Sequence, residues 1–198
     1  MTRTGLRVLL AGLALVLAGC TSISVPDGRT PSPGPTIARL EQRAALESCP
    51  ASSASAGTVS NGLPAETLSC IGPGPAVHLA GLRGPAVVNL YGTWCGPCGK
   101  EAGFLSSAAA ADKGTVTFLG VDIDDTITDA LSYAAATKPP AHYPLVADPD
   151  DTVIHTYNPG PPATLFLNGS GQVVHVEHRA FTSTAAVQAD VRRYLKVS

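Results

Sequence analysis

Residues Tyr91–Cys98 read YGTWCGPC and place two cysteines two residues apart behind a tryptophan. The apolar run 86–91 just before them predicts a buried β-strand. Pro97 is favoured in the first turn of a helix, and the alanine-rich stretch after it continues that helix. Cys95 should therefore lie at a helix N-terminus, where the helix dipole lowers the pKa of a thiol. Cys98, one turn into the helix, is placed to attack a mixed disulfide on Cys95. This arrangement is suited to thiol–disulfide exchange.

The segment Trp94–Cys98 after an apolar strand resembles the active site of the thioredoxin superfamily. Its surroundings resemble the extracytoplasmic, membrane-tethered TlpA/ResA-like branch of that superfamily. The resemblance implies an α/β, thioredoxin-like fold with a central mixed sheet flanked by helices. It also implies that Cys95 is the attacking thiol, that Cys98 is the resolving thiol, and that Trp94 helps to shape the surface where clients dock. No cofactor and no metal are implied.

The N-terminus has the pattern of a lipoprotein signal peptide. Two arginines precede an apolar run, and Leu17–Cys20 matches the lipobox of bacterial lipoproteins, in which Cys20 carries the lipid. The alternative is an uncleaved transmembrane anchor, for which the apolar run is short. Either arrangement leaves the remainder outside the cytoplasm. The expected organisation is a signal peptide at 1–19, a disordered tether at 20–35, an N-terminal extension at 36–69 and a thioredoxin-like domain at 70–198.

Five cysteines is an odd number, and lipid attachment at Cys20 resolves it. With Cys95 and Cys98 as the redox pair, Cys49 and Cys70 remain, and in an oxidising compartment they are expected to form a structural disulfide. One alternative is that these two are a second redox relay. Another is that Cys95 and Cys98 form half of a zinc site, which would need a further close pair of cysteines or histidines.

Periodicity and turn residues predict alternating strands and helices after the cysteine-free loop that precedes Cys70. The stretch from Asp122 to Tyr157, with two helices and the loop 138–144, resembles the central insertion of the TlpA-like branch. The expected helices are 36–48, 97–111, 128–137, a shorter turn at 148–156, and 183–196. The expected strands are a short one beginning at 77, then 86–91, 115–121, 164–167 and 172–177.

The segment Gly160–Thr164 precedes a strand and corresponds to the cis-proline loop of the superfamily. By position Pro162 is the cis residue, and its backbone would face the cysteines and pair with a client chain. Pro161 departs from the family pattern because it removes an N–H group. The alternative is a plain proline-rich turn.

Asn89 occupies the position where cytoplasmic thioredoxins carry a buried aspartate, and an asparagine cannot take up a proton. Glu101, three residues after Cys98 on the same helix face, is the candidate replacement, as the resemblance to ResA-like proteins implies. The alternative is a solvated helix carboxylate. Gly103 stands where the family usually has a kinking proline, which leaves the path of the helix open.

Composition and spacing exclude several function classes. The net charge of −2, with no basic block, argues against nucleic acid as a partner. The five histidines have no metal-ligand spacing that suggests a site, so all are expected to be structural or surface residues. The peroxidase pattern Pro-x-x-x-Thr-x-x-Cys does not fit Cys95, since Val88 and Gly92 occupy its first two positions.

The sequence therefore predicts a lipid-anchored, extracytoplasmic thiol–disulfide oxidoreductase that exchanges disulfides with protein clients. As the resemblance implies, it acts as a reductase fed by a membrane electron donor, and cytochrome c maturation is a candidate process. The alternatives are an oxidase that passes electrons to a membrane acceptor while forming disulfides in secreted proteins, and a copper metallochaperone using Cys95 and Cys98. The copper alternative is weaker because Met1 is the only methionine.

Overall fold

The computed structural model describes residues 35–137, 143–157 and 160–197, which belong to one compact unit. The predicted signal peptide and Cys20 lie outside the described residues. So does the predicted tether, except for Pro35, which begins the first helix. Within the described ranges, no helix combines the length and the apolar character that crossing a membrane requires.

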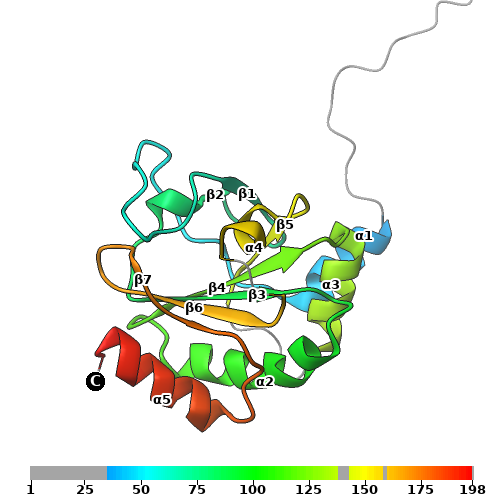
Figure 1. The fold of residues 1–198 in the computed structure, drawn as a ribbon. Coiled ribbons are helices and arrows are strands. Elements are labelled where there is room, and N and C mark those ends of the chain that lie inside the picture. The colour runs from blue at the N-terminus through cyan, green and yellow to red at the C-terminus, as the bar shows by residue number, and fades with distance from the viewer. Residues whose placement is uncertain (1–34, 138–142, 158–159, 198) are drawn as a thin grey trace, which may run out of the picture. The chain divides into compact units, whose positions relative to one another are not determined.

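Seven strands form one mixed sheet in the order β2-β1-β5-β4-β3-β6-β7 (Figure 1). The pairs β3–β4 and β4–β5 are parallel, and the other neighbours are antiparallel. The strands are β1 Thr67–Cys70, β2 Val77–His78, β3 Ala86–Tyr91, β4 Thr117–Ile123, β5 Leu145–Asp148, β6 Ala163–Leu167 and β7 Val173–Glu177. The helices are α1 Pro35–Ala44, α2 Gly96–Ala111, α3 Ile127–Ala136, α4 Thr152–Tyr157 and α5 Thr184–Leu195, with a 3₁₀ turn at Leu79–Gly81.

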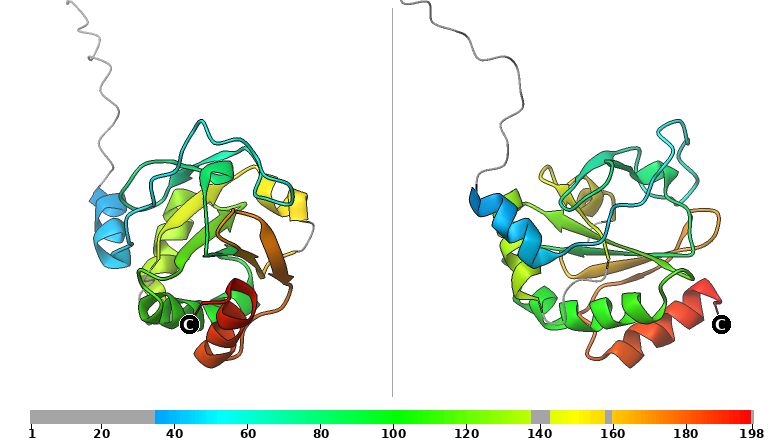
Figure 2. Two further views of the ribbon diagram at one scale, coloured as in Figure 1. Left: turned by 90° about the vertical axis from the view of Figure 1, so that its left-hand side faces the viewer. Right: turned by 180° about the vertical axis from the view of Figure 1, so that it is seen from behind.

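Helices cover both faces of the sheet, and side chains alternate between two cores. In β3, Val87 and Tyr91 face the core under α2, α3 and α5, whereas Val88 and Leu90 face the opposite core. All six residues of β3 are buried, which explains the continuous apolar run of residues 86–91. Helices α2 and α5 lie side by side on one face, and α1 packs against α3 (Figures 1 and 2).

Two strands were not predicted, because each is only four residues long and forms through distant partners. The loop expected before Cys70 contains β1, which pairs with β5 through Ser69↔Ala147 and Cys70↔Val146. The expected helix–loop–helix insertion contains β5, which lies between β1 and β4 in the sheet. The predicted domain boundary between residues 69 and 70 falls inside β1 and remains a sequence expectation.

Two predicted helix ends were wrong for local reasons. The helix expected at 36–48 ends at Ala44, because Ala45 adopts a left-handed backbone with φ of 47°. The helical turn expected from Asp148 begins at Thr152 instead. The Asp148 carboxylate accepts hydrogen bonds from the backbone N–H groups of Thr152 at 3.1 Å and Val153 at 2.9 Å, so it caps α4 rather than joining it. Helix α2 runs through Gly103 without a break.

Candidate active site

The cysteine pair begins α2. Cys95 is the N-cap residue, and its Sγ accepts a hydrogen bond from the backbone N–H of Cys98 at 3.2 Å. The two sulfurs are joined, with 5.3 Å between the Cα atoms. Cys95 is 6% exposed and Cys98 is 1% exposed, so the sulfur at the positive end of the helix is also the one nearer to solvent. This arrangement favours a thiolate at Cys95 once the pair is reduced.

Trp94 and Pro162 lie at the same edge of the sheet. Trp94 is 57% exposed, and its ring folds back over Gly92, where an added Cβ would come within 2.6 Å of the indole. The Pro161–Pro162 peptide bond is cis. Because Leu90 pairs with Ala163, continuing the register brings Pro162 level with Tyr91, just before the cysteine loop. An apolar ring and a cis-proline backbone therefore flank the cysteines.

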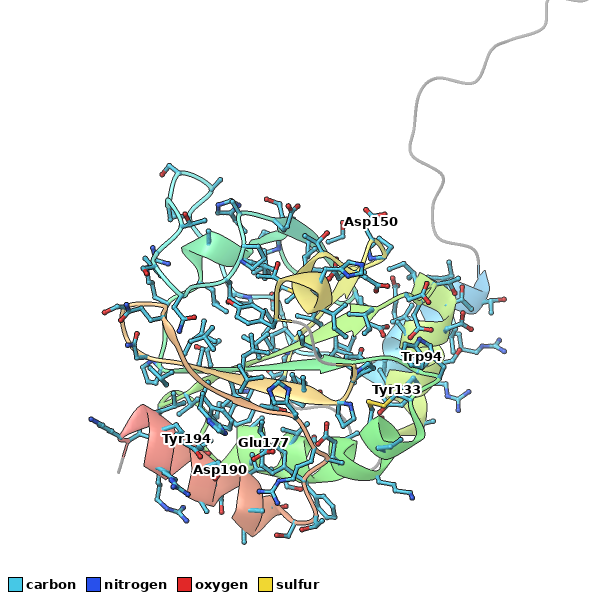
Figure 3. All side chains as sticks on the ribbon, in the orientation of Figure 1. Trp94, Tyr133, Asp150, Glu177, Asp190 and Tyr194 are labelled. Carbon is cyan, nitrogen blue, oxygen red and sulfur yellow. A yellow bond between two sulfur atoms is a disulfide. The ribbon has the colours of Figure 1, made fainter. Side chains whose placement is uncertain are left out.

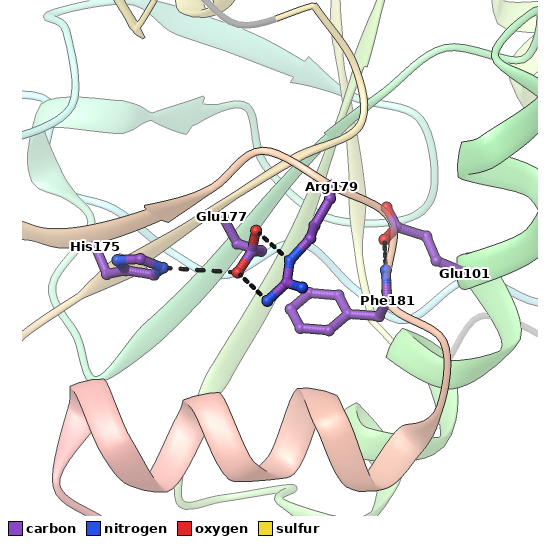
Figure 4. Close-up of polar contacts among 5 residues, drawn as sticks. All are labelled: Glu101, His175, Glu177, Arg179 and Phe181. Atoms are coloured by element: carbon purple, nitrogen blue, oxygen red, sulfur yellow. Dashed lines mark hydrogen bonds and ion pairs between the residues drawn. The ribbon is translucent and has the colours of Figure 1, made fainter.

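Glu101 is fully buried and accepts two hydrogen bonds. The Asn89 side-chain amide donates to Oε1 at 3.0 Å. The backbone N–H of Phe181 donates to Oε2 at 2.8 Å, as Figure 4 shows. Burial raises the pKa of Glu101 from 4.5 to about 7, against the lowering effect of these two donors. The solvated-carboxylate alternative for Glu101 was wrong. Asn89 also donates to Thr164 Oγ1 at 3.0 Å and so links β3, α2 and β6.

A cavity of about 10 Å³ lies beside Cys98, the size of one water position. Tyr91, Tyr133 and Tyr143 contribute to its wall, and the rings of Tyr91 and Tyr133 stack with 5.4 Å between centroids. Burial raises the pKa of all three hydroxyls, that of Tyr133 to about 12, so they remain neutral at physiological pH. Cys98 therefore faces an interior of low polarity.

Cys49 and Cys70 form the expected disulfide, with 6.1 Å between their Cα atoms. Cys49 is buried in the segment after α1, and Cys70 ends β1. The bridge therefore ties the N-terminal segment to the sheet.

Sequence reasoning missed that the carboxylate of Asp125 contacts the cysteine loop. Asp125 does not cap α3, because Thr126 is the N-cap residue of that helix. The Asp125 carboxylate instead accepts hydrogen bonds from Thr93, from the backbone N–H at 2.6 Å and from Oγ1 at 2.7 Å. Asp122, which ends up buried in β4, was not considered either. The available signal was the presence of three aspartates within four residues after a buried strand, Asp122, Asp124 and Asp125.

A third polar cluster lies at the outer strand β7. Glu177 contacts Arg179, with Nε to Oε1 at 3.0 Å, and lies 3.9 Å from His175 Nε2 (Figure 4). Burial acts to raise the pKa of Glu177, but Arg179 outweighs it and the pKa is lowered. His175 stacks on Tyr194 with 3.8 Å between centroids, a packing role. Within the described ranges, no three His, Cys, Asp or Glu residues are grouped as a metal site.

Comparison with known families supports the fold and the cysteine motif. A profile of the AhpC/TSA family matches residues 63–176. The chain belongs to this family. The matched range runs from just before β1 into β7. It contains Cys70, Cys95 and Cys98, and Cys49 lies before it. The thioredoxin-like fold predicted from the motif is confirmed.

Curated relatives of this AhpC/TSA-family chain include thiol–disulfide enzymes. Thiol-disulfide oxidoreductase ResA of Bacillus subtilis is 29% identical over 106 residues, covering 52% of this chain and 58% of the relative. A thiol:disulfide interchange protein DsbE homologue of Paracoccus denitrificans is 34% identical over 97 residues, covering 48% of this chain and 51% of the relative. The matches thus span between half and two thirds of the length of these two relatives, and the predicted kinship with ResA-like proteins is confirmed.

A solved structure shows the same fold over most of its length. It is a secreted disulfide oxidoreductase of Mycobacterium tuberculosis homologous to Escherichia coli DsbE. It is 25% identical with a TM-score of 0.57, and the match covers 65% of this chain and 96% of that one. About a third of this chain therefore has no counterpart in that structure.

Proposed function

We propose that this chain is an extracytoplasmic thiol–disulfide oxidoreductase that works through Cys95 and Cys98. The observation that carries the proposal is the position of the pair at the start of α2, with the more exposed sulfur as the N-cap. A sulfur held there is stabilised as a thiolate, which is the reactive form. The names of the ResA and DsbE relatives support the same activity.

In the reducing direction the reaction has two exchange steps. The Cys95 thiolate attacks a client disulfide, a mixed disulfide forms, and one client sulfur leaves as a thiolate. Cys98 then loses its proton and attacks Cys95 Sγ, which closes the Cys95–Cys98 bond and releases the second client thiolate. Two electrons pass from the enzyme dithiol to the client, and the released thiolates take up two protons. A dithiol donor must then reduce the enzyme again.

Glu101 is proposed as the group that accepts the Cys98 proton. It lies one turn after Cys98 on the same helix, and its pKa of about 7 matches that of a general base near neutral pH. Asn89 cannot take up a proton, but its side-chain amide donates a hydrogen bond to the Glu101 carboxylate at 3.0 Å and holds it in place. We therefore assign proton transfer to Glu101 and its orientation to Asn89.

Trp94 and Pro162 are proposed to form the client-docking surface. The exposed indole offers apolar area, and the backbone at the cis proline can pair with an extended client segment. Both flank the cysteines at one edge of the sheet. A client disulfide presented by an extended chain would thus be held against Cys95.

We further propose that a lipid on Cys20 anchors the protein outside the cytoplasm and that it acts as a reductase with a membrane electron donor. The lipobox pattern supports the anchor. The Gly-Pro dipeptide between the cysteines and the kinship with the TlpA/ResA-like branch support the reducing direction, with cytochrome c maturation as the client process. The compartment is supported by the secreted character of the Mycobacterium tuberculosis relative.

The deciding experiment is the reduction potential of the Cys95–Cys98 pair in glutathione buffers, read by alkylation and mass spectrometry. A potential near that of thioredoxin, about −270 mV, supports the reductase, whereas one near −120 mV indicates an oxidase. A Cys95→Ser variant should lose insulin-reduction activity, and Ser55→Ala in an exposed loop is the control. Unchanged activity in the Cys95 variant would contradict the whole proposal.

A further inference from the structure

A buried carboxyl group, that of Asp122, and a half-buried one, that of Asp125, lie close to the cysteine loop. Strands β3 and β4 are parallel neighbours, so their C-terminal ends meet at one edge of the sheet. Tyr91, which ends β3, pairs directly with Asp122 near the end of β4. Their side chains share a sheet face, which is the one covered by α2 and α3. Asp122 therefore lies under the point where the chain enters the cysteine loop.

Asp125 connects this region to the loop itself. Its two carboxylate oxygens accept hydrogen bonds from the backbone N–H and from the hydroxyl of Thr93, at 2.6 and 2.7 Å. Thr93 lies two residues before Cys95. Asp124 adopts a left-handed backbone with φ of 52°, which turns the chain after β4 toward the loop. Two short, charge-assisted bonds to one residue hold the loop firmly.

Asp122 is 2% exposed, and neither of its oxygens accepts a hydrogen bond from a described N–H or O–H group. Asp125 is close enough to hydrogen-bond with it if one of the two carboxyl groups is protonated. Burial, with further contributions from Asp125 and Asp129, raises the pKa of Asp122 to about 9. The other groups that face it are Tyr91 of β3 and Tyr133 of α3, and none of these four neighbours is cationic.

We propose that Asp122 and Asp125 share one proton as a carboxylic acid–carboxylate pair that positions Thr93 and, through it, the loop that presents Cys95. Asp122 donates the shared proton to Asp125, and the Asp125 carboxylate holds Thr93. Both are positioning residues, since neither touches the sulfurs. The positioning of the loop stands on the contacts alone, and its effect on the reactivity of Cys95 rests on the proposed exchange activity.

The pair makes the loop sensitive to alkaline pH. When Asp122 loses its proton, two like charges face each other in a partly buried space, and the hydrogen bond between them is lost. Asp125 then moves away from Asp122, and Thr93 shifts with it. Trp94 is the only tryptophan of the chain and directly follows Thr93, so its fluorescence reports this movement.

The first test uses the oxidised protein, in which the cysteines do not titrate. We expect Trp94 emission to change between pH 7 and pH 10.5 with a midpoint near 9, and we expect Asp122→Asn to abolish that change. Asn keeps a donor for Asp125 but cannot ionise. Asp150→Asn, on the exposed turn before α4 and apart from Trp94 (Figure 3), is the control and should keep the transition. A transition that persists in Asp122→Asn, or one that is missing in the unmodified protein, overturns the proposal.

The second test measures the alkylation rate of Cys95 in the reduced protein at pH 6.5. Asp125→Asn removes a negative charge near the loop, so we expect the thiolate fraction and the rate to rise at least threefold. Asp122→Asn should stay within twofold of the unmodified protein because Asp122 is already neutral. Equal acceleration by both variants would show that Asp122 is ionised and would overturn the shared proton. If exchange activity were absent altogether while the fluorescence transition held, the proposed function would fail and the carboxyl pair would stand.

Discussion

Cys95 and Cys98 lie only three positions apart in the sequence, yet their surroundings differ. Cys95 caps α2 and is the more exposed residue, whereas Cys98 lies beside a cavity walled by tyrosines. A thiolate is stabilised by the helix N-terminus and disfavoured by an apolar interior. The two thiols are therefore expected to have separate pKa values and separate roles.

The first prediction concerns which thiol reacts. Iodoacetamide added to the reduced protein at pH 7 should label Cys95 at least tenfold faster than Cys98, because the helix N-terminus favours its thiolate. Peptide mass spectrometry after short labelling times gives both rates. Faster labelling of Cys98 would reverse the assigned roles.

The second prediction concerns Glu101. Glu101→Gln should slow resolution of a mixed disulfide about tenfold at pH 8 while leaving the first attack by Cys95 nearly unchanged. In the unmodified protein the resolution rate should rise between pH 6 and pH 8, as Glu101, with a pKa of about 7, becomes ionised and able to accept a proton. Stopped-flow decay of a mixed disulfide measures this step.

The matched control is Glu41→Gln, an exposed glutamate on α1, which should change neither rate. Asn89→Asp in the Glu101→Gln background should restore part of the lost rate, since it returns a titratable group beside position 101. A Gln variant with an unchanged pH profile would show that Glu101 is structural only.

Among the elements, β1 and the segment before it depend on distant partners. β1 pairs with β5, and the Cys49–Cys70 bridge fastens the segment after α1 to the end of β1. α1 in turn packs on α3. The N-terminal segment is thus held by a strand pairing, a helix contact and one covalent bond.

The third prediction follows from that bond. Replacing Cys49 and Cys70 together by Ser should lower the free energy of unfolding by about 3 kcal/mol, the loop-closure entropy that a bridge over 21 residues removes from the unfolded chain. Guanidinium denaturation under oxidising conditions measures it. Exchange activity at Cys95 should persist, and its loss would instead indicate that Cys49 and Cys70 take part in a redox relay.

On the scale of the whole molecule, two buried acids couple stability to pH. Burial raises the pKa of Glu101 to about 7 and that of Asp122 to about 9, both above the ordinary range of carboxyl groups near 4. For each group, at pH values between its ordinary pKa near 4 and its raised pKa, the folded state keeps a proton that the unfolded state has released. Stability contributed by these groups is therefore complete at acidic pH and is lost as pH rises.

The fourth prediction is that the free energy of unfolding falls between pH 5.5 and pH 8.5. Glu101 alone should account for about 2 kcal/mol of the fall, from the interval between pH 5.5 and its folded pKa of about 7. Urea denaturation at both pH values measures the change. Glu101→Gln and Asp122→Asn should each make the dependence shallower, and a dependence of the opposite sign would contradict the burial of both acids as neutral groups.

The sequence by itself determined the parts of the protein that rest on local chemistry. The apolar run 86–91, Pro97 after Cys95 and the small residues that follow predict a strand that passes into a helix at the cysteines, and the structure has β3 and α2 there. The cis bond at Pro162 was expected from the superfamily resemblance and its loop position, and the Cys49–Cys70 pairing from cysteine arithmetic; both are present.

Only the tertiary structure decided which polar groups are buried and with what partners. Glu101 could face solvent or the interior on sequence grounds, and in the folded chain its buried carboxylate accepts a hydrogen bond from Phe181, which is 80 residues away. Thr93 and Asp125 meet across 32 residues because β3 and β4 are parallel neighbours. The short strand β1 likewise exists through its pairing with β5. These contacts are non-local, so no window of sequence contains both partners, and their energies depend on burial that exists only after the chain has folded.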